Sequence, residues 1–503
     1  MPPAADLARL DGFRLPEDFS FGVATAGFQV EGGFNGPGEP RNNWYDWEVE
    51  GRVEPSGIAN DSWHRYDDDF AATEAMGCDA YCLSIEWARV QPTFDGTDDE
   101  PPVDEAAVHH YAAMVAAARR RRVEPYVTLH HFTHPRWLGL DLWLRSESPG
   151  LFARWATEIV RRLNRALVEA GGSPCTRYVT LNEINIVALN TWWDGAFPGG
   201  GLFGAGRTRR ALDHLLAAHV GAYGAIHDVH EAEGWPAPMV STPNFAFATW
   251  ETDRGLTDLL LARRRGVARD DLAAYLTECR RRWYDALARL PHPGWTPGER
   301  ALGWLTGRVL PLDLPAATEA IYASSRDDAL DAVGTDIYAP WSSGRFRLPG
   351  HRTAGGRTPK PWRQLWDDPP MPAVLANFSR LHAGDDGLPV WILENGLCNR
   401  VRRGVSYPRL DGWTRVRYLR EHLAQLALVV ASGVDVSVYL HWCLFDNYEW
   451  GSYEPRFGLH GVDRERGVRR LAHDSMGGDA ARTYRRIIES LRSGDELAAA
   501  LSA

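Results

Sequence analysis

The chain is almost free of lysine. Of its 503 residues, Lys360 is the single lysine, and it lies in a Pro-flanked TPKP segment that is typical of a surface loop. Pyridoxal phosphate enzymes and Schiff-base aldolases both need a buried, activated lysine. The near absence of lysine therefore argues against both chemistries.

Long apolar runs and a targeting segment are missing as well. No stretch of roughly 18 apolar residues is present, and residues 1–13 have neither the basic region nor the apolar core of a secretion signal. The six cysteines (Cys78, Cys82, Cys175, Cys279, Cys398 and Cys443) include no CxxC pair and imply no disulfide framework. We expect a cytoplasmic protein with reduced thiols and no membrane partner.

The chain also lacks an excess of basic residues. It carries 55 Lys and Arg against 66 Asp and Glu, for a net charge of -11. Because nucleic acids and anionic membranes are bound by basic surfaces, neither is an expected partner. The 44% of hydrophobic residues can form a large core. A neutral small molecule fits this composition better as a ligand.

Eight β-type runs alternate with amphipathic segments along the chain. The runs are 21–25, 79–87, 124–132, 177–183, 238–244, 331–338, 389–394 and 434–442, and helical spacing is clear at 104–122, 149–171, 208–232 and 413–432. This alternation is typical of an α/β fold of the (β/α)8 TIM-barrel type. We predict a single catalytic domain over 1–503, with its core at about 13–490 and a flexible tail at 493–503.

A doubly wound open sheet is the alternative fold. Such a sheet usually has a phosphate-binding loop early in the chain, and the one GxGxxG match, Gly199 to Gly204, follows a loop and opens no clear helix. We interpret the match as a flexible loop. The segment 252–328 is long for one strand-to-helix connection, so we expect extra helices there, over the barrel mouth.

Two glutamates end β-type runs far apart in the chain. Glu183 lies in TLNEIN at 180–185, and Glu394 lies in WILENG at 391–396. The carboxyl ends of barrel strands open onto one mouth, so both side chains should meet there. Paired carboxyls in one site can divide the roles of acid and nucleophile between them.

Aromatic residues and histidines gather near the expected strand ends. The chain has 21 tryptophans, and five of them follow expected strands: Trp192, Trp193, Trp341, Trp442 and Trp450. Indole faces at a barrel mouth suit the C–H faces of sugar rings. His130, His131 and His134 are close in sequence, but adjacent strand residues point to opposite faces and no HExxH helix accompanies them. We therefore expect no metal site there.

At this point a family resemblance becomes clear. From about Phe19 to Asp463 the chain resembles the retaining β-glycosidases of glycoside hydrolase family 1, the β-glucosidase and β-galactosidase type. The ordered motifs are FSFGVATAGFQVEG (19–32), TLHHF (128–132), TLNEIN (180–185), GTDIY (334–338), LENG (393–396), HWCLFDNYEW (441–450) and RFGL (456–459).

The resemblance implies a mechanism and a set of site residues. Glu394 would be the nucleophile and Glu183 the acid/base of double-displacement hydrolysis of a β-D-hexoside, with no metal or organic cofactor. The substrate-binding residues would be Gln29, His131, Asn182, Tyr338, Trp442, Glu449, Trp450 and Phe457. Glu449 would suit the 4- and 6-hydroxyls of an unphosphorylated hexose, because a 6-phosphate would be repelled at short range.

Five residues depart from the family pattern. Cys82 stands where the family usually has an arginine that contacts the nucleophile carboxylate. The others replace a tryptophan (Phe132), an asparagine (Asp336), a proline (Ile184) and a threonine (Leu393). Loss of the cation should raise the pKa of Glu394 and loosen its position. Hydrolysis is the favoured function, and a scaffold redirected to an unusual glycoside or to a rearrangement in a specialised natural-product pathway is the alternative. Because both glutamates are present, an inactive sugar-binding barrel is disfavoured.

Overall fold

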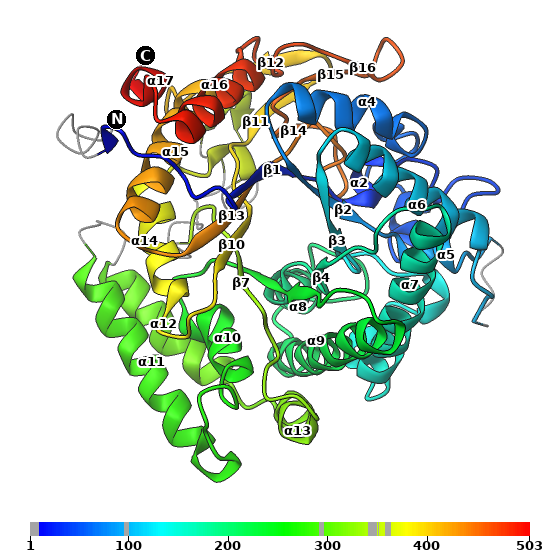
Figure 1. Cartoon of the computed structure of the whole chain (residues 1–503), viewed down its shortest axis with the longest axis vertical. Helices are drawn as coiled ribbons and strands as arrows, with labels where there is room; N and C mark the ends of the chain where they lie inside the picture. Colours follow the sequence, from blue (N-terminus) through cyan, green and yellow to red (C-terminus); the bar gives the residue numbers. More distant parts are fainter. Residues whose placement is uncertain are drawn as a thin grey trace.

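A computed structural model describes residues 10–94, 100–290, 296–340, 350, 352–357 and 364–502. Its helices surround a central ring of strands (Figure 1). Lys360, expected in a surface loop, and Trp341, expected at the barrel mouth, both lie outside the described residues.

The central sheet is a closed parallel barrel. Its order is β5-β4-β3-β2-β1-β13-β10-β7-β6, and all its pairings are parallel. The strands are β1 Ser20–Ala24, β2 Ala80–Ser84, β3 Glu124–Thr128, β4 Arg177–Val179, β5 Met239–Ser241, β6 Pro243–Phe245, β7 Val333–Asp336, β10 Val390–Glu394 and β13 Val436–Trp442. Only Thr242 separates β5 from β6. Together they form one interrupted barrel strand that pairs with β4 on one side and β7 on the other, so the (β/α)8 prediction is confirmed.

The expected amphipathic segments form the outer helices. The four segments named from the sequence are α6 Glu105–Arg120, α7 Ser148–Glu169, α9 Ala205–Glu233 and α15 Arg415–Ala431, joined by α4 Ser62–Ala75, α8 Ile184–Trp192, α14 Pro372–Ala383 and α16 Ala480–Ser493. The side chain of Asp104 accepts hydrogen bonds from the first backbone N–H groups of α6. Thr414 does the same for α15. These caps explain where the two helices begin.

Short elements lie in the loops between these helices and strands. They are α2 Gly27–Val30, α3 Tyr45–Val49, α5 Trp87–Val90, β8 Arg352–Thr353, β9 Gly356–Arg357, β11 Asn399–Arg402, β12 Val405–Tyr407, β14 Pro455–Arg456, β15 Val462–Asp463 and β16 Arg469–Arg470. Strand β11 pairs with both β12 and β14 in a small antiparallel sheet.

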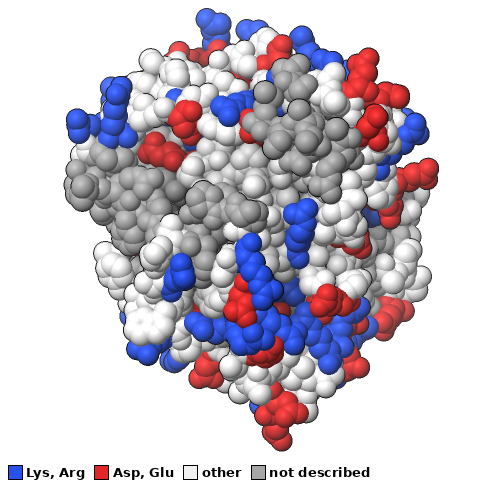
Figure 2. Space-filling view, turned by 90° about the vertical axis from the view of Figure 1, so that its left-hand side faces the viewer, with Lys and Arg blue, Asp and Glu red and all other residues white. Residues whose placement is uncertain are grey.

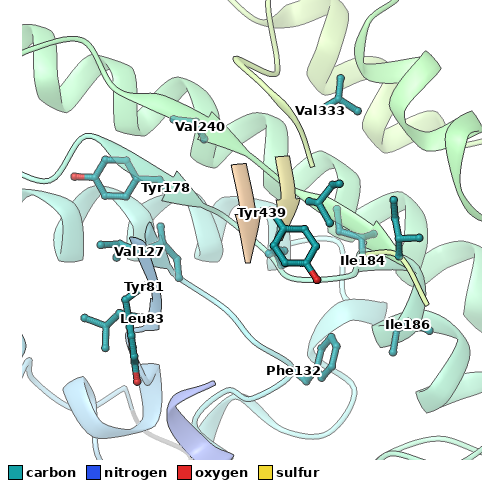
Figure 3. Packing of buried hydrophobic residues seen from close by; sticks show 14 of the residues in the cluster. Tyr81, Leu83, Val127, Phe132, Tyr178, Ile184, Ile186, Val240, Val333 and Tyr439 are labelled. Carbon is teal, nitrogen blue, oxygen red and sulfur yellow. The ribbon is translucent and has the colours of Figure 1, made fainter. Parts of the chain in front are cut away.

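Alternate residues of the barrel strands enter two different cores. On β2, Tyr81 and Leu83 belong to the large cluster that packs between barrel and helices, part of which is drawn in Figure 3. The neighbouring Cys82 belongs to a second cluster inside the barrel. On β10, Trp391 and Leu393 lie in the inner cluster. This period of two is what a barrel strand requires, and it decides which side chains can reach the site.

Two expectations about loops and ends are wrong. Helix α9 begins directly after Gly204, so the glycine-rich match does open a helix, although it follows helix α8 and no strand. At the C-terminus, residues Leu497–Ser502 form helix α17 where a flexible tail was expected. Leu497 and Leu501 are buried. The apolar side chains of this segment pack on α15 and α16, which explains its order.

The long segment 252–328 holds the extra helices that were predicted. They are α10 Arg254–Leu260, α11 Leu272–Arg289, α12 Pro297–Val309 and α13 Pro315–Ala323.

The arginines between α10 and α11 are paired with acids: Arg264 with Asp328 at 2.7 Å and Arg265 with Asp386 at 2.5 Å. Figure 2 shows basic side chains gathered in a band across the lower half of one face of the molecule, with acidic side chains among them. Separately, no described helix is both long and apolar enough to cross a membrane.

Candidate active site

Three carboxyl groups meet at the carboxyl ends of the barrel strands. One oxygen each of Glu183, Asp336 and Glu394 lies within 4.8 Å of the others. Glu183 follows β4, Asp336 ends β7 and Glu394 ends β10, and all three side chains are buried. The structure therefore brings the two predicted glutamates together and adds an aspartate between them.

A strand irregularity aims Glu394 into the barrel. Leu393 already points inward, so strict alternation would turn the next side chain outward. The register of β10 against β7 shifts between Ile392 and Glu394, and Glu394 pairs with Asp336. Such bulges reorient side chains and occur often beside active sites.

The backbone at Glu183 is also unusual. Its φ is 41°, in the left-handed region, and helix α8 begins at the next residue. A non-glycine residue held there costs on the order of 1–3 kcal/mol and is found most often at functional sites. The strained turn holds the carboxyl of Glu183 near that of Glu394.

Glu394 is held by three predicted site residues. Asn182 donates from Nδ2 to its Oε1 at 3.2 Å, and the Tyr338 hydroxyl donates to its Oε2 at 3.0 Å. His131 Nε2 lies 3.8 Å from the same Oε1. Burial raises the pKa of Glu394 to about 8, and the hydrogen bonds from Tyr338 and Asn182 oppose this increase.

His131 is a neutral ring at the centre of an aromatic wall. Burial lowers its pKa to about 3. Its ring stacks on those of Trp442 and Trp450, each at 5.8 Å between centroids, and Asn182 Nδ2 lies 3.3 Å from its Nε2. Phe132 packs on Trp450 at 4.8 Å. These faces form an apolar wall beside the carboxyl groups.

The remaining predicted sugar ligands lie next to this wall. Gln29 donates from Nε2 to Glu449 Oε2 at 3.3 Å, and its own Oε1 is buried with no hydrogen-bond partner among the described residues. The pKa of Glu449 is raised to about 8 by burial, then by the charge of Glu394. Phe457 meets the ring of Tyr338 edge-on at 6.2 Å. All eight predicted ligands therefore line one region.

Other candidates named from the sequence do not join the site. His130 packs edge-on against Trp143, and His134 Nε2 lies 3.1 Å from the carbonyl of Gly139. Neither belongs to the one described group of side chains that could hold a metal ion. Trp192 is buried in α8, and Trp193 packs on Phe203 away from this wall.

Cys82 lies inside the barrel beneath the carboxyl groups. Its Sγ is 3.2 Å from Thr128 Oγ1. Burial raises its pKa to about 12, helped by the charges of Glu394 and Asp336. A neutral thiol thus occupies the position where the resemblance placed an arginine.

Asp336 is the site residue that the sequence reasoning noted only as a departure. It is fully buried, and neither carboxylate oxygen accepts a hydrogen bond of normal geometry from the described residues. Burial raises its pKa well above 3.8, with further contributions from the charges of Glu394 and Glu183. The available signal was its place two residues before the end of the β-type run 331–338, whereas the two glutamates each end such a run.

The closeness of the carboxyls controls their protonation. Two negative charges 4.8 Å apart repel each other by about 3.5 kcal/mol at an effective dielectric constant near 20. This energy corresponds to about 2.5 pKa units. This repulsion adds to burial in raising the pKa of Asp336.

The barrel and the paired carboxyls at its mouth define the class of protein, a (β/α)8-barrel glycoside hydrolase. The family model described as "Glycosyl hydrolase family 1" matches residues 12–244 and 366–490, well over half of the chain. The chain belongs to glycosyl hydrolase family 1, and the predicted family is confirmed.

Curated relatives cover the chain almost from end to end. A bifunctional β-D-glucosidase/β-D-fucosidase of Bifidobacterium breve is 28% identical over 94% of this chain and 98% of its own. A β-glucosidase of Agrobacterium is 27% identical over 91% and 92%, and a 6-phospho-β-galactosidase of Lacticaseibacillus rhamnosus is 26% identical over 90% and 94%. The chain is a glycoside hydrolase with retaining β-glycosidase activity, and these relatives do not favour the redirected or the inactive scaffold.

Solved structures agree on the fold. The β-glucosidase of Thermotoga maritima has a TM-score of 0.66 at 20% identity, covering 95% of this chain and 98% of that one. The β-glucosidase of Trichoderma harzianum has a TM-score of 0.66 at 22% identity, covering 95% and 98%. At these identities the likeness supports the barrel alone.

Proposed function

We propose that the chain hydrolyses the β-glycosidic bond of an unphosphorylated β-D-hexoside, with Glu394 as nucleophile and Glu183 as acid/base. One observation carries the assignment of these roles: oxygens of the two carboxyls lie within 4.8 Å of each other. In retaining enzymes the carboxyls are about 5 Å apart, whereas inverting enzymes leave about 6.5–9.5 Å for a water molecule.

In the first step Glu394 attacks the anomeric carbon while Glu183 gives its proton to the departing oxygen. A glycosyl ester forms on Glu394 as the bond to the leaving group breaks. Asn182 and Tyr338 donate to separate oxygens of Glu394 and hold it in line for attack. The transition state resembles an oxocarbenium ion, which negative carboxylates stabilise.

In the second step Glu183, now without its proton, takes a proton from water as the water attacks the anomeric carbon. The ester to Glu394 breaks, and Glu183 is again protonated. His131 is neutral and cannot supply a second charge. Its Nδ1, which has no hydrogen-bond partner among the described residues, is left for a sugar hydroxyl, next to the indole faces of Trp442 and Trp450.

The environment of Glu449 supports an unphosphorylated sugar. Among the described residues Glu449 forms no ion pair with arginine or lysine, and its pKa is already raised by burial and by Glu394. A sugar phosphate would add negative charge to this acidic pocket at short range, which costs several kcal/mol. The 6-phospho-β-galactosidase among the relatives is therefore the less suitable guide to substrate.

A cytoplasmic location is also part of the proposal, supported by cysteines without CxxC pairs.

A panel of p-nitrophenyl β-D-glycosides tests the reaction. We expect release of p-nitrophenol from the glucoside, galactoside or fucoside and loss of turnover in Glu394→Gln. The 6-phosphates of glucoside and galactoside, run beside them, should be poorer substrates. Turnover confined to the phosphorylated substrates would contradict the choice of sugar, and full activity of Glu394→Gln would contradict the nucleophile.

Trapping the intermediate tests the two roles directly. A 2-deoxy-2-fluoro-β-glycosyl fluoride of the preferred sugar should add one fluoroglycosyl group to the protein, located by peptide mass spectrometry on Glu394. Glu278, on the surface helix α11, gives a matched control, because Glu278→Gln removes a glutamate that pairs with Arg281 far from the barrel interior. The control should be labelled like the wild type. A label on Glu183 would reverse the proposed roles.

A further inference from the structure

A buried carboxyl that takes no part in the reaction joins two loops of the barrel mouth. Glu86 lies just after β2, directly before α5, and is 2% exposed. Its Oε1 accepts a hydrogen bond from the backbone N–H of Phe28 at 2.9 Å, and its Oε2 accepts one from the Thr133 hydroxyl at 2.7 Å. Because both oxygens are bonded within the protein, Glu86 acts on neighbouring loops rather than on a substrate.

The first contact of Glu86 holds the short helix α2. The N-cap residue of this helix, Ala26, forms no side-chain hydrogen bond to the first turn. The N–H of Phe28 has no acceptor within so short a helix, and Glu86 supplies one from another element. A Cβ added at Gly27 would lie 2.7 Å from Cγ of Glu86, so carboxyl and helix are in close contact. Gln29, a predicted sugar ligand, is the next residue of this helix after Phe28.

The second contact of Glu86 holds the loop that follows β3. Thr133, which donates to Glu86, is two residues after His131 in this loop. His131 Nε2 lies 3.8 Å from Glu394 Oε1, so this loop brings a predicted sugar ligand to the nucleophile. One carboxyl thus joins the backbone that carries Gln29 to the backbone that carries His131.

Glu86 is itself held in place by buried hydrogen bonds. Its backbone N–H donates to the Tyr111 hydroxyl at 3.1 Å, and that hydroxyl donates to Glu31 Oε1 at 2.8 Å. Arg89 pairs with Glu31 at 2.8 Å and donates to the carbonyl of Gly32 at 2.7 Å. Glu31 is the C-cap residue of α2, so neighbouring elements hold both ends of this helix. Bonded, buried supports of this kind keep binding groups in a fixed geometry.

We propose that Glu86 is a positioning residue that fixes the separation of Gln29 and His131, so that both side chains meet the hydroxyls of one sugar ring. This inference rests on the proposed function, because it takes Gln29 and His131 as sugar ligands. Hydrogen bonds weaken steeply as their distances and angles depart from the preferred values. Removing the link should therefore lower kcat/KM, although neither reacting glutamate is changed.

The test compares Glu86 variants by kcat/KM on the preferred p-nitrophenyl glycoside at about pH 6. Burial, and next the charge of Glu31, raises the pKa of Glu86 to about 8, so a neutral side chain is a fair replacement at this pH. Glu86→Gln keeps both contacts, because its amide oxygen accepts from Phe28 and its amide nitrogen donates to Thr133. It should stay within about twofold of the wild type, whereas Glu86→Ala should lower kcat/KM by about ten- to a hundredfold.

A double-variant cycle distinguishes positioning from a purely structural role. Residues that act through one another give non-additive effects. Glu86→Ala should cost about threefold less, or better, in the Gln29→Ala or the His131→Ala background than in the wild type, because one positioned ligand is already missing. Thr133→Val keeps the size of the side chain and removes its hydroxyl. It serves if Glu86→Ala does not fold, and it should lower kcat/KM by about three- to tenfold.

Asp213 provides the matched control on the outside of the barrel. This buried carboxyl of α9 accepts from the backbone N–H groups of Ala316 and Ala317, at 3.1 and 2.8 Å, at the start of α13. It therefore also holds the first turn of a helix from another part of the chain. Asp213→Ala should lower the thermal unfolding temperature, as Glu86→Ala does, and keep the wild-type kcat/KM.

The results separate this inference from the proposed function. Wild-type kcat/KM in folded Glu86→Ala, or in Thr133→Val, overturns the positioning role. So does a loss in Glu86→Gln as large as that in Glu86→Ala, or a cost of Glu86→Ala that is unchanged in both ligand backgrounds. Each of these results leaves hydrolysis by the wild type in place, whereas absence of turnover and of fluoroglycosyl labelling in the wild type overturns the proposed function itself.

Discussion

Replacing Cys82 by arginine should restore a cation beneath the nucleophile. In the free protein the pKa of Glu394 is about 8, raised first by burial. At pH 7 a carboxyl with that pKa is ionised in about one tenth of the molecules. Only the ionised form attacks, so the acidic limb of kcat/KM against pH should lie at the pKa of Glu394 in the wild type.

The size of the expected change follows from the geometry. Cys82 is close enough to Glu394 and Asp336 for both charges to raise its pKa. A unit charge about 5 Å from Glu394 contributes about 3 kcal/mol at an effective dielectric constant near 20, or about 2.4 pKa units. Known ion pairs lower carboxyl pKa values by about 1–3 units. Cys82→Arg should therefore move the acidic limb down by 1–3 units and raise kcat/KM at pH 7 by about five- to tenfold.

The assay is the pH profile of kcat/KM on the best p-nitrophenyl glycoside, measured for wild type, Cys82→Arg and Cys82→Met. The methionine variant adds bulk without charge, so it reports the cost of overpacking at this buried position, about 1–3 kcal/mol of stability. Its acidic limb should not move. A folded Cys82→Arg protein with an unmoved limb and no gain at pH 7 would refute the idea that the missing cation handicaps Glu394.

Three further changes follow from the contacts of the carboxyls. Glu183→Ala should reduce kcat by about 10²- to 10⁴-fold on alkyl glycosides and far less on glycosides with good leaving groups, with azide restoring turnover as β-glycosyl azide. Tyr338→Phe removes a hydrogen bond to the charged Glu394 that is worth about 1.5–3 kcal/mol. The acidic limb of the variant's kcat/KM profile should therefore lie about 1–2 pH units higher than that of the wild type. Asp336→Asn should stabilise the fold by about 1–3 kcal/mol in thermal or urea unfolding. The pKa of Asp336 is higher in the folded state than in the unfolded state, so the wild type loses stability as pH rises above about 4. The difference in unfolding free energy between Asp336→Asn and the wild type should therefore increase from about pH 5 to pH 8.

The barrel was predictable from the sequence because hydrophobic pattern alone determines it. Buried parallel strands such as β10 are continuous apolar runs, and amphipathic helices such as α7 have a clear period. The ends were less predictable. Helix α17 is short and Ala-rich, and its order depends on contacts with α15 and α16 that no local pattern reveals.

The site was predictable as a set of residues and only partly as an arrangement. Strand-end position identified Glu183 and Glu394, and ordered motifs identified the residues around them. The bulge that turns Glu394 inward depends on its pairing with β7, so it could not be read from one strand. The place of Asp336 between the glutamates depends on that same pairing.

Cys82 and Asp336 have a joint effect that neither has alone. A cation at position 82 would compensate a carboxylate at position 336, and an amide at position 336 would tolerate a neutral thiol at position 82. With thiol and carboxylate together, burial and the neighbouring carboxylate charges raise the pKa of Asp336, and burial raises that of Glu394. The double variant Cys82→Arg with Asp336→Asn should lower the pKa of Glu394 further than Cys82→Arg alone, because it adds a cation and removes a neighbouring negative charge. The pH profiles of kcat/KM for the wild type, the two single variants and the double variant on one p-nitrophenyl glycoside measure this difference.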